Sequence, residues 1–244
     1  MLSKNQFKLI AGLKQKKQRT ANQLFVAEGK KVILELLNSD FQLHQLYTTT
    51  SEYKVSDDMS TRITPKELKR ISFLKTPQAA LAIFKIPEPK PIELNGLIVA
   101  LDNVRDPGNL GTIIRLCDWF GIRDLVCSSE TADCYNPKVV QASMGSLARV
   151  NVTYSDLEVL LKYSGLSSLG TFMDGSNIFT TDLPQKGIIV FGNEAHGISE
   201  PLENLVQQKI GIPRFGSIQL TESLNVANAM AIVMAEFKRR TIEK

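Results

Sequence analysis

The sequence predicts an α/β protein of two domains, on three observations. Short apolar runs alternate with helical patterns along the chain, which is the order of elements in α/β folds. The runs in the second half are rich in Ile, Leu and Val, as in a parallel sheet covered by helices on both faces. A proline-rich stretch, Pro87-Glu88-Pro89-Lys90-Pro91, separates the halves and holds the chain extended. We therefore expect a small α/β domain over 1–86, a linker over 87–96 and a larger α/β domain over 97–244.

The first domain is predicted from short strands and two helical signals. Apolar runs over 24–27, 42–48 and 79–86 favour strands, and 30–37 favours a helix. Thr64-Pro65-Lys66-Glu67 has the pattern of a capping box with Pro at the first helical position, so we expect a helix to begin there.

The second domain is predicted from five buried strands and a long final helix. The expected strands are Leu97–Leu101, Leu125–Cys127, Leu169–Met173, Ile188–Phe191 and Lys209–Ile212. The final helix, over about 223–240, carries apolar residues that could face a core or a second copy of the chain: Leu224, Ala227, Ala231, Met234 and Phe237. The helix is apolar enough to serve both a core and a subunit interface.

Composition excludes several classes of protein. The chain has 244 residues, of which 43% are hydrophobic and 22% charged, as in an ordinary globular protein. No apolar run approaches the roughly 18 residues of a membrane span, and the N-terminal stretch lacks an apolar signal core. We expect no membrane association and a cytoplasmic location. Cys117, Cys127 and Cys134 are odd in number and lack zinc-site spacing, so we expect buried, reduced thiols and no metal.

The N-terminal stretch is cationic. Six basic residues precede the first acidic residue, Glu28: Lys4, Lys8, Lys14, Lys16, Lys17 and Arg19. On a helix they would form a broad surface that suits phosphates. An isolated charge run is more often a solvated helix face. The motifs of the second domain favour the phosphate-binding interpretation here.

Three polar clusters each follow an apolar strand and precede a helical pattern, where an open α/β sheet gathers its ligand-binding loops. The first is Asn103-x-x-Asp106-Pro107-x-Asn109-x-Gly111-x-x-x-Arg115. It has the composition of a turn, after which we expect Asn109 or Gly111 to open a helix with Arg115 one turn further in. Alone, it could be a capped loop with a surface arginine. It lacks the Gly-x-Gly-x-x-Gly spacing of a dinucleotide site.

The second and third clusters add glycines, a carboxylate and amides. Gly192-Asn193-Glu194-Ala195-His196-Gly197 precedes Ser199, a candidate helix cap, and Glu194 suits a cation or hydroxyl better than a plain turn. A lone histidine is more often structural than catalytic, so His196 receives no role. Ile212-Pro213 ends a strand, and Ser223-Leu224-Asn225 opens the last helix, where capping by Thr221 or Ser223 is the simpler explanation.

In this order the three clusters resemble the motifs of the SpoU/TrmH family of RNA ribose 2′-O-methyltransferases, in the SPOUT superfamily. The resemblance covers about 97–240. It implies a fold with a deep trefoil knot formed by the C-terminal segment, S-adenosylmethionine as cofactor, and a homodimer through the knotted domain. Phe25-Val26-Ala27-Glu28-Gly29 looks like part of the ribosomal-protein-like RNA-binding domain fused to such enzymes. The stretch from Ile212 to Leu224 is about three residues longer than in compact members, which affects the register of cofactor contacts.

The resemblance also implies residue roles. Arg115 matches the catalytic arginine, Glu194 the acid of the second motif, and Ser223 with Asn225 the polar pair of the third; Asn109 joins them as a catalytic candidate. The backbone around Gly192, Ile212 and Leu224 matches the cofactor-binding loops. The basic residues from Lys4 to Arg19 would bind RNA, ribosomal or transfer. Because a guanidinium resists deprotonation, we expect Arg115 to orient the ribose-phosphate and stabilise alkoxide charge rather than act as base.

Two other classes of function stay open at this point. One is a non-catalytic RNA-binding protein with a vestigial cofactor pocket, which measurable cofactor binding would argue against. The other is a nucleotide-dependent α/β enzyme such as a dehydrogenase, which the missing glycine fingerprint disfavours.

Overall fold

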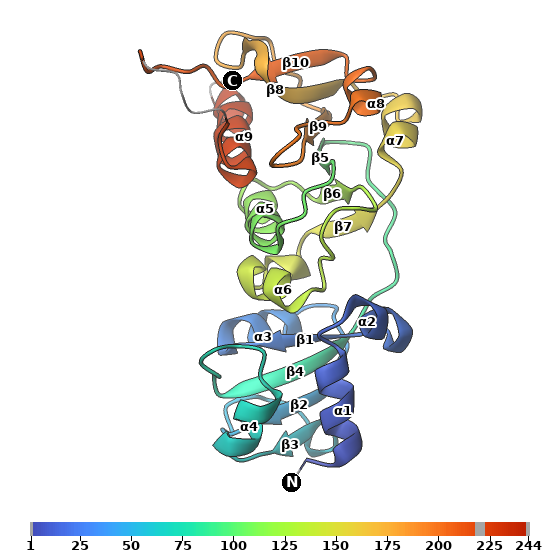
Figure 1. Cartoon of the computed structure of the whole chain (residues 1–244), viewed down its shortest axis with the longest axis vertical. Coiled ribbons are helices and arrows are strands. Elements are labelled where there is room, and N and C mark those ends of the chain that lie inside the picture. The colour runs from blue at the N-terminus through green and yellow to red at the C-terminus, as the bar shows by residue number, and fades with distance from the viewer. Residues whose placement is uncertain (1, 218–222, 243–244) are drawn as a thin grey trace. The chain divides into compact units, whose positions relative to one another are not determined.

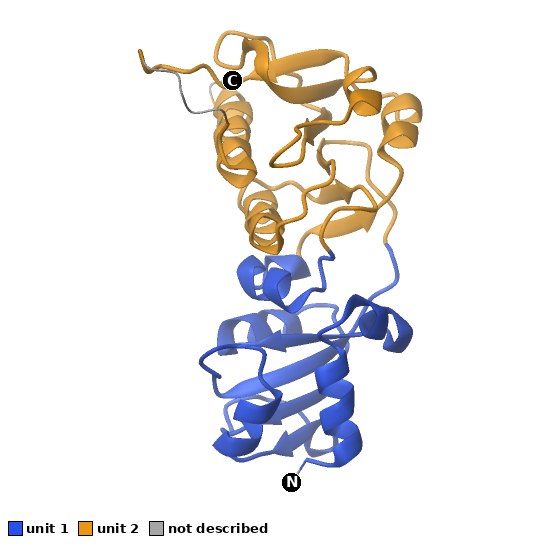
Figure 2. Cartoon of the chain, viewed as in Figure 1, with its two compact units in different colours: residues 1–89, 133–148 blue, residues 90–132, 149–244 orange. Residues whose placement is uncertain are grey.

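The computed structural model describes residues 2–217 and 223–242. The chain forms two compact units (Figure 2). Unit 1 consists of 1–89 together with 133–148, and unit 2 of 90–132 together with 149–244. The sequence did not indicate that 133–148 belongs with the N-terminal unit.

Unit 1 is a four-stranded sheet with helices on it (Figure 1). Its strands are β1 (Leu24–Glu28), β2 (Leu43–Thr48), β3 (Ser60–Arg62) and β4 (Ala80–Lys85), in the order β1-β4-β2-β3. Its helices are α1 (Lys4–Gly12), α2 (Lys16–Asn22), α3 (Lys30–Leu37), α4 (Pro65–Ile71) and α6 (Pro137–Ser143), with 3₁₀ turns η1 (Asp57–Met59) and η2 (Ser146–Ala148). β4 pairs antiparallel with both β1 and β2, whereas β2 and β3 are parallel.

The predicted elements of unit 1 are confirmed, with β3 added. The Thr64 side chain accepts from the Glu67 amide while the Glu67 carboxylate accepts from the Thr64 amide, so the capping box starts α4. Phe25 on β1 is fully buried and packs against Tyr135, with ring centroids 4.9 Å apart. The segment 133–148 therefore completes the core over β1.

Unit 2 is a six-stranded sheet in which every pairing is parallel, in the order β10-β8-β9-β5-β6-β7. Its strands are β5 (Leu97–Leu101), β6 (Asp124–Cys127), β7 (Asn151–Tyr154), β8 (Ser168–Asn177), β9 (Gly187–Phe191) and β10 (Gln208–Gly211). Its helices are α5 (Pro107–Trp119), α7 (Leu157–Tyr163), α8 (Glu200–Glu203) and α9 (Val226–Ile242). Within unit 2, α5 and α9 lie on one side of the sheet and α7 and α8 on the other (Figure 1). The predicted parallel sheet is confirmed, although β7 was not foreseen.

β8 is longer than predicted and contains a wide irregularity. Lys209 on β10 pairs with Gly170, but the next residue, Ile210, pairs with Ser176. Residues 171–175 thus leave the ladder beside β10. A Cβ atom on Gly175 would lie 2.3 Å from the Ile210 carbonyl carbon, so this close passage of two backbones requires glycine.

Within the described ranges, no helix is long and apolar enough to cross a membrane, and no group of three or more His, Cys, Asp and Glu could hold a metal ion. The three cysteines are buried, and none of them forms a disulfide within the described residues.

Candidate active site

The first motif is the loop between β5 and α5 together with the first turns of that helix. The Asp106 carboxylate accepts from the Asn109 amide at 2.8 Å and caps the helix, and Pro107 occupies its first position. The helix thus begins at Pro107, earlier than the Asn109 or Gly111 expected from the sequence. Early helical residues such as Asn109 are thereby fixed relative to the end of β5.

The loop backbone is held by residues that follow other strands. Asn103 has a left-handed φ of 62°, its amide donates to the Ser128 hydroxyl at 2.9 Å, and its carbonyl accepts from the Asn193 side chain at 2.7 Å. The buried Asp102 carboxylate accepts from the Ser199 amide at 2.7 Å. Together these bonds join the first motif to the second.

The second motif is a tight turn organised by Asn193. Its side-chain oxygen accepts from the amides of Ala195 and His196, at 2.9 and 3.1 Å, and its backbone pairs with Gly197. A Cβ on Gly192 would lie 2.1 Å from the Gly197 carbonyl carbon, so Gly192 is needed for the turn to close. Asn193, Asp102 and Ser128 were not predicted as site residues; only the position of Asn193 in the motif could have suggested it.

Three predicted catalytic residues form one chain of hydrogen bonds. The Asn109 amide nitrogen donates to the Glu194 carboxylate at 2.9 Å, and the Asn109 oxygen accepts from the Asn225 amide nitrogen at 2.9 Å. The Asn225 oxygen in turn accepts from the backbone amides of Ala227 and Asn228. Asn225 therefore caps α9, and the suggestion that Ser223 does so is wrong; Thr221 lies outside the described residues. One residue from each motif is thus joined in a single chain of side chains.

Arg115 is exposed on α5 and, among the described residues, has no hydrogen-bond or ion-pair partner. Ser223 is exposed too, and its hydroxyl makes no hydrogen bond within 2–217 and 223–242. His196 is likewise exposed. A guanidinium without a protein partner is available to a phosphate or a developing oxyanion.

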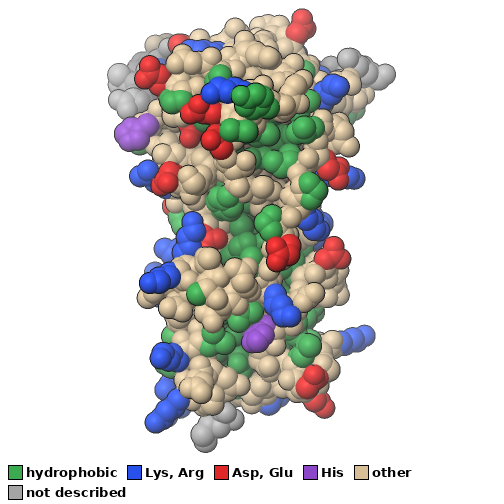
Figure 3. Space-filling view, turned by 90° about the vertical axis from the view of Figure 1, so that its right-hand side faces the viewer, with side chains coloured by type: hydrophobic (Ala, Val, Ile, Leu, Met, Phe, Trp, Pro, Cys, Tyr) green, Lys and Arg blue, Asp and Glu red, His purple; other side chains and the backbone are tan. Residues whose placement is uncertain are grey.

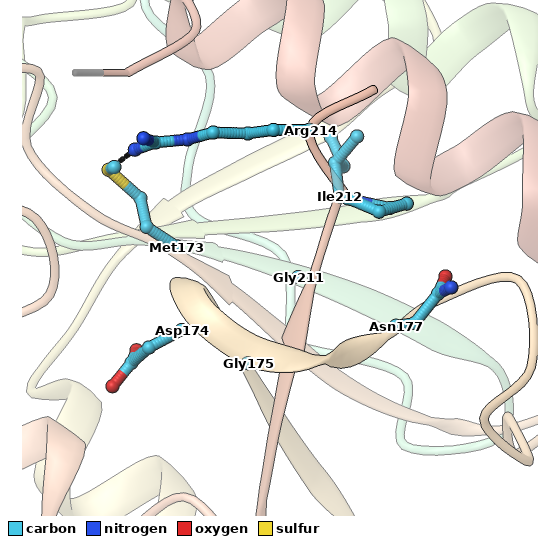
Figure 4. A pocket seen from close by; sticks show the side chains of 8 residues that line it. Met173, Asp174, Gly175, Asn177, Gly211, Ile212 and Arg214 are labelled. Atoms are coloured by element: carbon cyan, nitrogen blue, oxygen red, sulfur yellow. Dashed lines mark hydrogen bonds between the residues drawn. The ribbon is translucent and has the colours of Figure 1, made fainter. Parts of the chain in front are cut away.

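A cavity of about 430 Å³ lies where 171–175 leave the sheet. Its lining comes from the β8 irregularity and the segment after β10: Met173, Asp174, Gly175, Asn177, Gly211, Ile212, Pro213 and Arg214. The Arg214 side chain extends along one side to Met173, whose sulfur accepts from Nη2 at 3.9 Å (Figure 4). Of the predicted cofactor-binding residues, Ile212 lines this cavity, whereas Gly192 and Leu224 are not in the described lining. Leu220, where the loop register was in question, lies outside the described residues.

The basic N-terminal stretch forms two helices. Lys4, Lys8, Lys14, Lys16 and Lys17 are exposed on α1, α2 and the turn between them, and Lys and Arg side chains protrude at several places on unit 1 (Figure 3). Arg19 is the exception, because its side chain is 2% exposed and pairs with Asp133. It also donates to the carbonyls of Leu13 and Lys14, both at 2.9 Å. The expectation that Arg19 joins the cationic surface is therefore wrong, since all its donors face inward.

The sequence profile described as SpoU rRNA Methylase family matches residues 96–235. The chain belongs to this family. A second profile, the MRM3-like substrate binding domain, matches residues 4–82 of this SpoU family member. Both matches agree with the resemblance seen in the sequence.

Individual relatives cover nearly the whole SpoU chain. The 23S rRNA (guanosine(2553)-2'-O)-methyltransferase RlmP of Bacillus subtilis is 30% identical over 229 residues, which are 90% of each protein. The structure of a putative RNA methyltransferase of the TrmH family from Porphyromonas gingivalis is 37% identical with a TM-score of 0.91, covering 98% of this chain and 99% of that one. An AdoMet-bound rRNA methyltransferase from Sinorhizobium meliloti is 29% identical with a TM-score of 0.87, covering 98% and 96%.

Proposed function

We propose that this protein transfers a methyl group from S-adenosylmethionine to a ribose 2′-hydroxyl of structured RNA, and that the RNA is ribosomal. The hydrogen-bonded chain from Glu194 through Asn109 to Asn225 carries this proposal, together with the exposed Arg115 on the helix that also holds Asn109. The relatives named as rRNA methyltransferases support the choice of RNA.

The cavity residues have the chemistry to hold the cofactor. Asp174 offers a carboxylate for an ammonium or ribose hydroxyls, and Arg214 offers a guanidinium for a carboxylate. Ile212, a predicted cofactor-binding residue, lines the same cavity (Figure 4). S-adenosylmethionine supplies a methyl group already activated on a sulfonium. The assignments of Gly192 and Leu224 to cofactor binding stay predictions.

The protein must then align the ribose and stabilise charge on its oxygen. Arg115 keeps its proton, so it acts by holding the ribose-phosphate and the developing alkoxide rather than as a base. The Asn109 side-chain amide is bonded to both Glu194 and Asn225, so it holds the three side chains in one arrangement. The site therefore does not need to rearrange during the reaction. Ser223 has its hydroxyl available for the ribose. The proton leaves to phosphate or water.

The direct test uses the full chain, ribosomal RNA from a strain lacking the gene, and labelled S-adenosylmethionine. Methyl transfer to one 2′-oxygen, found by nuclease digestion and mass spectrometry and missing only in RNA from that strain, is the expected result. Cofactor binding without transfer to ribosomal or transfer RNA would instead support a non-catalytic RNA-binding protein, and transfer to tRNA alone would correct the substrate.

We also propose a homodimer, a cytoplasmic location and the trefoil knot implied by the resemblance. Ala227 and Met234 of α9 are buried within the chain and belong to its core, so they are not available to a second copy. Trp119 at the end of α5 and Ile242 at the end of α9 remain 85% and 83% exposed, and these apolar groups suit a subunit contact. Light scattering should give twice the chain mass of 27.1 kDa; a monomer at micromolar concentration would contradict the dimer.

A further inference from the structure

Two exposed aromatic side chains stand together beside the cavity. Phe215 is 84% exposed and Phe179 is 41% exposed, and their ring centroids lie 6.5 Å apart with the planes tilted by 37°. Burying a phenylalanine stabilises a fold by about 1.5–3 kcal/mol, so two phenylalanines left in water contribute little to this fold. Their rings are available to another molecule.

The turn that carries Phe179 is firmly held. Its amide donates to the Asn177 side chain at 3.0 Å, and the amides of Thr180 and Thr181 donate to the Asn177 carbonyl. Arg240 of α9 donates to the carbonyls of Ile178 and Thr181, and Ile178 is fully buried. The exposure of Phe179 is therefore fixed by its turn.

Both aromatics adjoin residues that line the cavity. Phe179 follows Asn177 by two positions, and Phe215 directly follows Arg214. The pair thus combines two apolar rings with a guanidinium at the edge of the proposed cofactor cavity. Unpaired bases in RNA are bound in this way, by stacking on aromatic rings with a cation near the backbone.

We propose that Phe215 and Phe179 form a stacking platform for an unpaired base of the RNA substrate, next to the nucleotide that is methylated. Arg214 directly precedes Phe215, so its guanidinium adds positive charge at this edge of the cavity. The inference rests on the proposed function, and it names the form of RNA that is recognised: a loop or bulge whose bases are splayed out rather than a continuous duplex. The two other possible occupants, the cofactor's adenine and a second copy of this chain, are separated from it by the test.

The test compares Phe215→Ala and Phe179→Ala with Tyr163→Ala, which removes an 80% exposed aromatic from α7 in the same unit. Three quantities are measured for each full-length variant: KM or Kd for the RNA, affinity for S-adenosylhomocysteine, and mass by light scattering. Loss of one stacked base should raise KM and Kd for RNA on the order of tenfold. Phe215→Trp should restore RNA binding, while Tyr163→Ala, cofactor affinity and mass should not change.

Each other outcome overturns the platform. Unchanged RNA affinity in Phe215→Ala would show that no base stacks there. A parallel loss of affinity for S-adenosylhomocysteine would assign the ring to the cofactor instead, and a change in mass would assign it to a subunit contact. RNA Kd is measured independently of turnover. An inactive wild-type enzyme would therefore count against the proposed function, while the variants would still decide the platform.

Discussion

Arg115 in unit 2 and the basic helices of unit 1 show two ways of using cations. The motifs are joined across long sequence separations, since Asn109 and Glu194 are 85 positions apart and Asn109 and Asn225 are 116 positions apart. Arg115 is exposed on the same helix as Asn109, and no hydrogen bond or ion pair holds it among the residues that the structure describes. In unit 1 the exposed lysines of the N-terminal stretch lie on two short helices and the turn between them, whereas the buried Arg19 contributes to packing.

This difference corresponds to two physical demands. Chemistry requires reacting groups to be held in place, and in the proposed function the hydrogen bonds between the motifs meet this demand. Attraction of a phosphate backbone requires only charge near the surface, because the interaction is long-ranged and insensitive to geometry. Substitutions should therefore affect the two regions in different ways.

Arg115→Ala should have the largest effect. Removing a donor aimed at developing charge should lower methyl transfer by about 10³-fold or more, with affinity for S-adenosylhomocysteine unchanged. Arg123→Ala removes another exposed arginine of unit 2 and should leave transfer unaffected. Single-turnover transfer and calorimetry on both variants check this, and transfer by Arg115→Ala at near wild-type rate would remove Arg115 from the mechanism.

Arg19→Met should destabilise unit 1 rather than weaken RNA contacts. It leaves the Asp133 carboxylate, which is 15% exposed, without its cation, at a cost of about 3 kcal/mol in the free energy of unfolding. Lys17→Met, on the exposed side of the same helix, should change it by less than about 0.5 kcal/mol. Denaturant unfolding of the two variants measures the difference; equal stabilities would show that the buried pair contributes nothing.

Asn109→Asp should disrupt the link between the motifs. The new carboxylate cannot donate to Glu194 and repels it, so the three residues lose their common arrangement. A misplacement of about 1 Å can cost about 10²-fold in rate, and we expect a loss of that order in kcat. Thr112→Ala, one turn along α5, is the control. An unchanged kcat in Asn109→Asp would mean that the chain of hydrogen bonds is structural only.

Replacing Lys14 and Lys17 by Gln should act on RNA binding through its salt dependence. Each phosphate contact contributes about 0.7 to 0.9 to the slope of log affinity against log salt, so the slope should become shallower by up to about twice that amount. Lys162 and Lys186 of unit 2, replaced together by Gln, are the matched pair. If the slope becomes shallower only when Lys162 and Lys186 are replaced, the RNA contacts lie on unit 2 instead.

The smallest expected effect is on stability at low pH, and we test it with one carboxylate from each unit. Hydrogen bonds from the Thr64 and Leu2 amides lower the pKa of Glu67 to about 2, and the Arg239 and Arg240 guanidiniums lower the pKa of Glu236 to about 2. A lowered pKa gives stability that is present above the ordinary value of 4.5 and lost as pH falls towards about 2. In Glu67→Gln and in Glu236→Gln, stability should therefore fall less between pH 4.5 and about 2 than in the wild type. Denaturant midpoints measured across this pH range check it. A loss as steep as in the wild type would argue against either assignment.

The sequence predicted what depends on local pattern. Apolar runs located most strands, and Thr64 with Glu67 marked the start of a helix. It missed the short strands β3 and β7, whose few residues carry little periodic signal. It also misjudged Arg19, because the acid that draws this side chain inward lies 114 positions away. The roles of Asn193 and Asp102 depend on bonds across 90 and 97 positions, which no local pattern encodes.

The discontinuity of unit 1 has a consequence for synthesis on the ribosome. Tyr135, which covers Phe25, follows β5, α5 and β6 in the chain, so unit 1 cannot complete its core when residue 89 emerges. Domains usually fold from the N-terminus as they are made, but here the first must wait until residues 133–148 are available. Nascent chains stalled before residue 133 should expose β1 to protease, and chains stalled well beyond 148 should protect it; protection in the shorter chains would show that 1–89 folds unaided.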